Sequence, residues 1–351
     1  MRLALANIWQ AKLLYGDLYD YSMTEYTSSD KKVEVGCNRC GRIFSVEANS
    51  HLQGHGCPYH YTNKSIDETE ILNYIKSIYG GIVYNNDRKT LGDGTELDIV
   101  IPEKNIAIEY DGLYWHNELN KPRNYHLVKT EKCNLMGIKL IHIFEDEWKN
   151  PVKRNIWKSM LANKLGLNTG KIYARKCEIK TVEKGVGYRF LEDNHIQGKC
   201  QSSILIGLYY EGELVSLMTF GKTRHFIGNS SHEYELLRFC NKVGVSVVGG
   251  ASRLFKYFVD SYSPKSVVSY ADYRWSDGTL YDNLGFVKYN VSKPNYYYVI
   301  GAERKNRFNF RKSALVRKYG CPMDMSEHEF CLSRKWYRIY DCGSLCYEWK
   351  K

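Results

Sequence analysis

Acidic residues interrupt two apolar segments near the middle of the chain, in LDIVIPEKNIAIEYDGLYWH at residues 97–116. Asp98 stands inside the first segment, and burying a carboxylate is costly unless a partner offsets the cost. The segments read as two strands joined by a turn at 102–105, so Glu109 and Asp111 share one strand face. We expect the turn to bring Asp98 beside them. Three carboxylates would form a hard-ligand site that suits Mg²⁺.

A histidine follows the second of these strands. His116 can take a proton from water near neutral pH, while a bound metal polarises a phosphoryl oxygen and lowers the pKa of its water. Glu68, on a helix expected over 65–80 with Ser65 as N-cap, is placed to complete or orient the cluster. The alternative is a surface ribbon with solvated carboxylates and His116 at its rim.

Two pairs of potential metal ligands, each with two residues between its members, lie near the start of the chain and form two zinc-knuckle motifs. A closed set of four soft ligands predicts tetrahedral, structural zinc, with a small hairpin between the knuckles. Free thiols or a redox CxxC motif would leave the second knuckle unexplained. The expected ligands are Cys37, Cys40, Cys57 and His60, with His51 and His55 as substitutes for His60.

Composition indicates a soluble, multidomain protein. A chain of 351 residues is too long for one ordinary core, and 43% hydrophobic with 25% charged residues is typical of globular proteins. We find no apolar run long enough to cross a membrane and no secretory leader, so we expect a cytoplasmic protein. Eleven scattered cysteines favour reduced thiols and metal ligands.

The charge and the aromatic content suggest a polyanionic partner. The net charge is +11, with 30 Tyr, 12 Phe and 7 Trp. Lysine and arginine neutralise phosphates while rings stack on bases. A basic protein without a nucleic-acid role is the alternative.

Alternating helical and strand patterns predict an α/β multidomain chain with modules at 1–64, 65–165 and 171–300 and a tail at 301–351. The second module reads helix, strand, strand, helix, strand, helix. In the third, Gly249 and Gly250 precede a helix, where backbone N–H groups can bind a pyrophosphate. The tail offers cations interleaved with phenylalanines, which suits DNA phosphates, although a solvated helix face is the alternative. The cations in question are Arg304, Lys305, Arg307, Arg311 and Lys312.

The acidic segment and its flanks resemble a nuclease family. Residues 65–150 are similar to the very-short-patch repair (Vsr-like) endonucleases of the PD-(D/E)xK superfamily, and especially to their phage-encoded homing-endonuclease relatives. The matching residues are Glu68 on the first helix, Asp98 as metal-binding aspartate and the YWH that ends in His116. A CxxC zinc module also precedes the nuclease in similar phage proteins. The resemblance implies a restriction-endonuclease-like core and Mg²⁺-dependent cleavage of DNA phosphodiesters.

Three positions depart from that family. Its catalytic lysine would fall at Asp111, so we expect no lysine-based mechanism. The repair enzymes carry threonine and histidine at Tyr110 and Asp111, and an acidic residue at His126. We therefore interpret Asp111 as a replacement metal ligand, and His126 as a residue that orients a metal ligand or contacts a phosphate. Mismatch repair is disfavoured, whereas a nickase or a double-strand homing endonuclease stays open.

The third module has its own resemblance. YADYRWSDGTLYDNLGFVKY at 270–289 resembles the closing strand, helix and strand of GNAT acyltransferases, over about 175–300. This implies an acetyl-CoA pocket, with Asp272 and Tyr281 near the acceptor. A degenerate GNAT-like fold with a DNA-binding or scaffolding role is the alternative. The implied pocket residues are Val248, Gly249, Gly250, Ala251 and Ser252.

Taken together, the sequence predicts a zinc ribbon, a restriction-endonuclease-like core and a GNAT-like domain in one Mg²⁺-dependent DNA endonuclease. Double-stranded DNA is the expected partner, with no membrane and no obligate protein partner. One alternative is a DNA-base-modifying acyltransferase that uses the nuclease fold for targeting. The other is a non-catalytic DNA-binding protein.

Overall fold

The computed structural model describes residues 2–38, 41–58, 66–168, 170–223 and 232–351. The chain forms two compact units, 1–69 and 70–351. Both helices and strands contribute to each unit, so the protein is a mixed α/β chain. Within the described ranges, no helix has the length and apolar character needed to span a membrane.

The first unit is built on a small antiparallel sheet in the order β1-β2-β3. Alternation along β2 turns Val33 and Val35 inward, where they pack with Phe44 and Tyr21. The elements are α1 (Arg2–Tyr15), β1 (Tyr19–Asp20), β2 (Lys32–Cys37), β3 (Ile43–Glu47) and α2 (Ala48–Leu52).

A four-stranded sheet begins the second unit, in the order β4-β5-β6-β7. The first two pairings are antiparallel, and β6 pairs in parallel with β7 through the crossover helix α4. All six residues of β6 are buried because the sheet has neighbours on both faces. The elements are α3 (Ile66–Ile78), β4 (Tyr84–Asp87), β5 (Leu97–Ile101), β6 (Ile106–Asp111), α4 (Tyr125–Leu135), β7 (Lys139–Phe144), α5 (Glu145–Lys149) and α6 (Pro151–Lys164). The first turn of α3, up to Thr69, is assigned to the first unit.

The turn expected between β5 and β6 is present as a 3₁₀ turn at Pro102–Lys104. Asn105 closes it with a φ of 52°, a left-handed conformation that asparagine tolerates well. The expected order of elements lacked β4, which is an edge strand. Its sequence, YNND, has no apolar alternation to reveal it.

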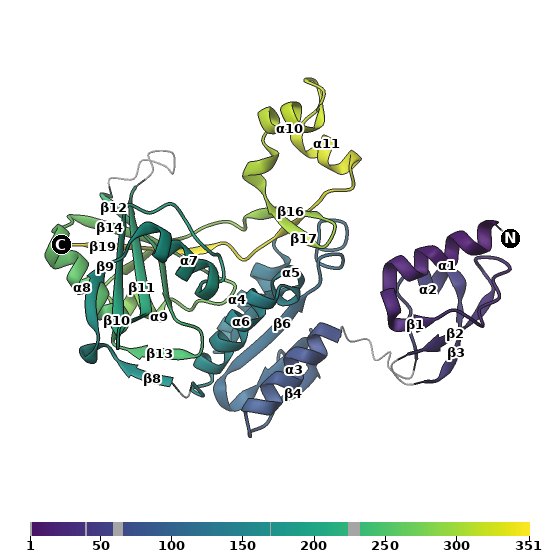
Figure 1. Ribbon diagram of the computed structural model, residues 1–351, viewed down its shortest axis with the longest axis horizontal. Coiled ribbons are helices and arrows are strands. Elements are labelled where there is room, and N and C mark those ends of the chain that lie inside the picture. Colours follow the sequence, from purple (N-terminus) through teal and green to yellow (C-terminus); the bar gives the residue numbers. More distant parts are fainter. Residues whose placement is uncertain (1, 39–40, 59–65, 169, 224–231) are drawn as a thin grey trace. The chain divides into compact units, whose positions relative to one another are not determined.

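A seven-stranded sheet follows, in the order β15-β19-β14-β12-β11-β10-β9 (Figure 1). On one face α8 packs Phe258 against Phe220, with ring centroids 3.6 Å apart. On the other, α7 packs Leu191 with Leu205. The elements are β8 (Gly170–Tyr173), β9 (Glu178–Thr181), α7 (Lys184–Asn194), β10 (Ile204–Tyr210), β11 (Glu213–Lys222), β12 (Tyr234–Asn241), β13 (Val245–Val248), α8 (Gly250–Tyr262), β14 (Ser266–Asp272), α9 (Thr279–Asn283), β15 (Val287–Val291) and β19 (Ser344–Lys350).

Two central strands of this sheet pair over only part of their length. β12 runs parallel to β14, but the pairing covers only 234–236 against 267–269. Beyond it the chain leaves β12 for β13, which pairs in parallel with β8. The sheet therefore opens between the carboxyl ends of β12 and β14.

The expectation of a separate tail at 301–351 is wrong. β19 lies between β14 and β15 and pairs with both, so the last residues complete the central sheet. The preceding segment forms the three-stranded sheet β17-β16-β18 with two helices. Its elements are β16 (Tyr296–Ile300), β17 (Glu303–Asn306), α10 (Lys312–Tyr319), α11 (Glu327–Ser333) and β18 (Tyr337–Tyr340).

Candidate active site and metal centre

Asp98 and Glu109 lie opposite each other on β5 and β6. The antiparallel register pairs Ile99 with Ile108, which puts these two carboxylates side by side on one face. The backbone N–H of Asp98 donates to Glu109 Oε1 at 3.2 Å. The N–H of Tyr110 donates to Asp98 Oδ2 at 2.8 Å. Two neighbouring strands thus hold the two carboxyl groups in fixed orientations.

Lys129 of α4 completes this group, and the sequence analysis missed it. Its Nζ donates to Glu109 Oε2 at 2.5 Å, and both side chains are buried. A lysine therefore does lie beside the two carboxylates, and it comes from the crossover helix α4 and not from the strand position of Asp111.

Burial and mutual repulsion set the charges of these groups. Burial, followed by the nearby Glu109 carboxylate, raises the pKa of Asp98 well above its usual range. Burial also raises the pKa of Glu109 to about 7, against the opposing effect of Lys129. Burial would lower the pKa of Lys129, but Glu109, Tyr125 and Asp98 together raise it. The lysine is therefore charged at neutral pH.

Asp111 is surrounded by imidazoles and fully buried. Its Oδ2 accepts from His142 Nδ1 at 2.9 Å. Its Oδ1 lies 3.1 Å from His116 Nδ1 and 3.4 Å from His126 Nε2. Burial would raise the pKa of Asp111, but His126, His142 and His116 hold it well below its usual range. The carboxylate is therefore ionised.

The structure does not gather the three expected Mg²⁺ ligands into one group. Among the described residues, the cluster whose ligand atoms all lie within 4.8 Å of one another consists of Asp111, His116 and His126. Asp98 and Glu109 are not members of it. Asp111 is drawn away from them because its carboxylate is committed to the histidines.

His116 and His126 do not have the surroundings that the sequence suggested. His116 Nδ1 lies 2.8 Å from His126 Nε2, and His126 Nδ1 lies 2.7 Å from the carbonyl oxygen of Tyr340. His126 is 2% exposed, so it cannot contact a DNA phosphate. Burial lowers the pKa of His116, against the effect of Asp111, so its ring is neutral at pH 7.

Two aromatic rings stand exposed in the loop between Asp111 and His116. Tyr114 and Trp115 are each 62% exposed. Their ring centroids are 4.9 Å apart in an edge-on arrangement. Large exposed rings next to a buried polar cluster indicate a contact surface.

Glu68 lies in the first turn of α3 and is buried. It belongs to the first compact unit, so its expected role beside Asp98 stays a prediction. Ser65, the expected N-cap, lies outside the described residues.

The expected zinc ligands are described only in part. Cys37 ends β2 and Cys57 lies beyond α2, and both are buried in the same core. Cys40 and His60 lie outside the described residues. His51 is not a substitute ligand in this arrangement, because its Nε2 bonds Tyr21 Oη at 3.0 Å and its Nδ1 bonds the carbonyl oxygen of His55 at 2.8 Å.

The expected acetyl-CoA loop lies between β13 and α8. Gly249 has a φ of 76°, which favours glycine, and it caps α8. Val248 and Gly249 line a shallow surface cleft together with Arg253 and Arg175. Gly250 begins the helix, followed by Ala251 and Ser252. Arg253 donates to the carbonyl oxygen of Ala174, which ties the helix start to the preceding segment.

A cavity of about 270 Å³ lies at the carboxyl end of β12, where α6 lines it with Ile156, Met160 and Lys164. Phe239 and Cys240 of β12, with Val245, form one wall. Trp275, which precedes α9, and Leu280 of α9 also line it. Polar side chains such as Ser159 and Asn194 share the lining with the apolar ones.

The two expected acceptor residues are held in other contacts. Asp272 pairs with Arg274 at 2.9 Å and accepts from Gln197. Tyr281 is buried, and its Oη accepts from Ser269 at 3.2 Å. The structure does not place them at one common site.

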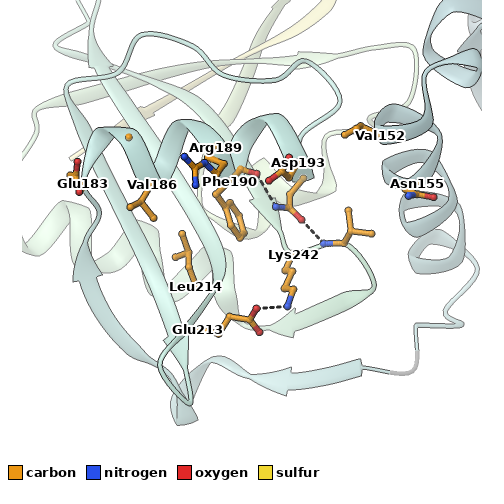
Figure 2. A pocket seen from close by; sticks show the side chains of 13 residues that line it. Val152, Asn155, Glu183, Val186, Arg189, Phe190, Asp193, Glu213, Leu214 and Lys242 are labelled. Carbon is orange, nitrogen blue, oxygen red and sulfur yellow. Dashed lines mark hydrogen bonds and ion pairs between the residues drawn. The ribbon is translucent and has the colours of Figure 1, made fainter.

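A wider depression of about 770 Å³ lies between α6 and α7 (Figure 2). Val152 and Asn155 face it from α6, and Arg189 from α7. Lys242 at its rim pairs with Glu213. Because this lysine is committed to a carboxylate, the depression offers no cluster of convergent cations.

Part of the expected DNA-binding segment is occupied by protein contacts. Arg304 is only 6% exposed and pairs with Asp146 at 2.7 Å and Glu147 at 2.6 Å. The ammonium of Lys312 donates to the carbonyl oxygens of Pro322 and Met325. The expected phosphate contacts are therefore wrong for these two residues. The exposed cations of the segment are Lys305, Arg307 and Arg311.

Comparisons with known proteins give three kinds of likeness. Residues 6–59 match the family described as "Protein of unknown function (DUF723)". One uncharacterized protein of Acanthamoeba polyphaga mimivirus is 43% identical over 74 residues, 20% of this chain. Another from the same virus is 38% identical over 56 residues, 16% of this chain. The chain spans 28% of the length of each of these relatives.

The third likeness is to solved acetyltransferases. One from Bacillus subtilis, in complex with CoA, has a TM-score of 0.29 and 13% identity over 50% of this chain and 99% of that one. A GNAT family acetyltransferase from Elizabethkingia anophelis with acetyl-CoA bound has a TM-score of 0.28 and 14% identity, with the same coverage. The activities in these names belong to those proteins.

Proposed function

We propose that the chain is a metal-dependent DNA endonuclease whose centre is formed by Asp98, Glu109 and Lys129. The observation that carries the proposal is a buried lysine held 2.5 Å from one of two neighbouring carboxylates on paired strands. Two carboxylates and an ammonium that converge on one sheet face are costly to bury. The arrangement fits phosphodiester hydrolysis, because that reaction needs both metal ligands and a fixed positive charge.

The residues present fit a hard divalent cation such as Mg²⁺. Burial raises the pKa of both carboxyl groups, and the nearby Glu109 carboxylate adds to the effect at Asp98. A cation between them would compensate the buried negative charge, and both groups offer the oxygens that Mg²⁺ prefers. When bound, such a metal polarises a phosphoryl oxygen and lowers the pKa of its water.

The chain's own residues would position and stabilise the reacting phosphate. Lys129 stays protonated, so its role is to balance negative charge and not to accept a proton. Tyr110 fixes the Asp98 carboxylate through its backbone N–H. Tyr114 and Trp115 offer exposed rings on which unstacked bases can pack, and the net charge of +11 favours DNA.

Single-turnover cleavage of plasmid DNA with Mg²⁺ tests this proposal. Asp98→Asn and Lys129→Met should each reduce the rate by roughly 10²-fold or more, as loss of one preorganised charge commonly does. DNA affinity should survive, because phosphate contacts elsewhere dominate it. Asp93→Asn, which alters an exposed carboxylate, is the matched control. Wild-type cleavage by Asp98→Asn would show that this cluster is not a nuclease centre.

A second candidate function is acyl transfer from acetyl-CoA, and the opening between β12 and β14 favours it. The cavity at the carboxyl end of β12 could hold an acyl-pantetheine chain, while the start of α8 at Gly249 offers backbone N–H groups to a pyrophosphate. The acetyltransferases named above bear on this candidate and not on the nuclease. In this function the four-stranded sheet would serve DNA targeting.

Thermal unfolding with acetyl-CoA separates the two candidates. If the cavity binds it, the melting temperature should rise with ligand concentration by mass action. Gly249→Val should abolish the rise, because a β-branched residue is strained at a φ of 76°. No rise at millimolar acetyl-CoA would exclude this second function and leave the nuclease proposal untouched.

A further inference from the structure

We propose that Asp111, His116 and His126 form a binding site for a transition-metal cation of the Zn²⁺ class, with the fourth position open. This site is separate from the Asp98 and Glu109 pair and does not rest on the nuclease proposal. It replaces the earlier assignment of Asp111 to a Mg²⁺ site.

The spacing of the three ligand atoms matches a tetrahedral metal site. The separations are 2.8 Å between the two histidine nitrogens, and 3.1 and 3.4 Å from Asp111 Oδ1 to each of them. Ligands about 2.0–2.1 Å from a metal at tetrahedral angles lie about 3.3–3.4 Å apart. A small adjustment of His116 would therefore admit a cation. Three protein ligands with one open position is the arrangement of catalytic zinc sites.

The hydrogen bond that His126 makes outside the cluster leaves its Nε2 available to bind a metal. His126 Nδ1 donates to the carbonyl oxygen of Tyr340 at 2.7 Å, so its Nε2 carries a lone pair toward the cluster. A metal-bound histidine usually donates its other N–H to such a carbonyl. Tyr340 is 214 residues away along the chain, so the fold as a whole determines this tautomer.

The carboxylate is oriented in the same way. His142 Nδ1 donates to Asp111 Oδ2 at 2.9 Å, and Thr130 Oγ1 lies 2.9 Å from His142 Nε2. The other oxygen, Asp111 Oδ1, is buried and accepts no hydrogen bond of good geometry. A fully buried carboxylate oxygen that faces two imidazole nitrogens is a strong candidate for a metal ligand.

The donor set selects the class of cation. Imidazole nitrogens suit Zn²⁺ and its first-row neighbours, whereas Mg²⁺ prefers oxygen ligands and retains its water. Access is possible on the side of His116, whose side chain is 14% exposed while Asp111 is 0% and His126 2%. The open position would give the metal a water or a substrate oxygen.

Metal content of the full chain tests the inference. Cys37→Ser serves as background, so that the expected cysteine site near the start of the chain does not contribute. Metal-free protein is incubated with Zn²⁺ in excess Mg²⁺, gel-filtered and analysed for zinc. We expect one Zn²⁺ per chain, and none after a further His126→Gln. If His126→Gln fails to fold by circular dichroism, His116→Gln replaces it, because that ring is nearer the surface.

Co²⁺ absorption and two further variants test whether the bound metal lies at Asp111, His116 and His126. Bound Co²⁺ should show tetrahedral d–d bands without a thiolate charge-transfer band, because the ligands are nitrogen and oxygen. His142→Gln should weaken Zn²⁺ binding by roughly 10- to 100-fold through loss of the contact to Asp111. His328→Gln, which alters a histidine paired with Glu118, should have no effect.

Two outcomes would overturn the inference. One is equal zinc content with and without His126→Gln, and the other is a Co²⁺ spectrum that His126→Gln leaves unchanged. Asp98→Asn should keep its zinc even if it cuts no DNA. The metal site and the nuclease proposal can therefore fail independently.

Discussion

At the scale of single residues, Glu109 gives the site a pH dependence of known sign. Its pKa is raised from 4.5 to about 7 by burial, so the folded state holds the proton more tightly than the unfolded state does. Stability from this group is therefore present below pH 4.5 and is lost as pH rises toward 7. The melting temperature of wild type should fall relative to Glu109→Gln across that range, without metal. A difference that stays flat with pH, as expected for the exposed Glu303→Gln, would contradict the assigned burial.

The position of a candidate site residue could be predicted where it depended on a single hairpin. Asp98 stood out because a carboxylate interrupted an apolar strand, and a four-residue turn was enough to place it opposite Glu109. Lys129 was missed because it lies on the crossover helix, 20 residues after Glu109 in the chain, and only the folded structure brings the two together. A signal was present: His126, Lys129 and Thr130 recur at helical spacing on one face, and all are buried.

At the scale of elements, the N-terminal hairpin makes a testable prediction about zinc. We expect Cys37, Cys40, Cys57 and His60 to hold one structural Zn²⁺. Cys57→Ser should release that metal and lower the melting temperature of the first unit, since metal binding is coupled to folding in small modules. Zinc analysis and circular dichroism of the variant provide the measurement. Cys200→Ser, which alters a half-exposed cysteine elsewhere, is the control, and unchanged zinc in Cys57→Ser would exclude the site.

Elements with strong periodicity were predictable, and those defined by distant partners were not. α8 followed from its amphipathic pattern after Gly249. β4 did not, because a polar edge strand owes its extended form to pairing with β5. β19 reads as a strand only once β14 and β15 are known to flank it.

At the scale of the whole molecule, a buried ion triad connects segments that the sequence suggested were separate modules. Glu147 of α5 accepts from Arg274, which follows β14, and from Arg304 of β17, at 3.2 and 2.6 Å. The domain boundaries expected from the sequence fell between these residues because no local pattern shows a contact made across 127 and 157 positions. The region from 70 to 351 is accordingly one compact unit.

Glu147→Gln should therefore destabilise this entire unit. Removing the carboxylate takes one of two acidic partners from each buried guanidinium and leaves Asp272 and Asp146 in place. The free energy of unfolding should therefore fall by about 3 kcal/mol, the lower end for breaking a buried ion pair. Burial would raise the pKa of Glu147, but Arg274 and Arg304 lower it to about 2. Its contribution is thus fully present above its ordinary pKa of 4.5 and is lost as pH falls toward 2.

Urea unfolding at pH 7 and pH 3 would measure both effects. The exposed pair of Glu303 and Lys305 provides the control, because solvent screens it and Glu303→Gln should leave the unfolding midpoint nearly unchanged. If Glu147→Gln unfolds the four-stranded and seven-stranded sheets in separate transitions, the triad is what makes them cooperative. If it changes neither the midpoint nor its pH dependence, the triad does not hold these segments together.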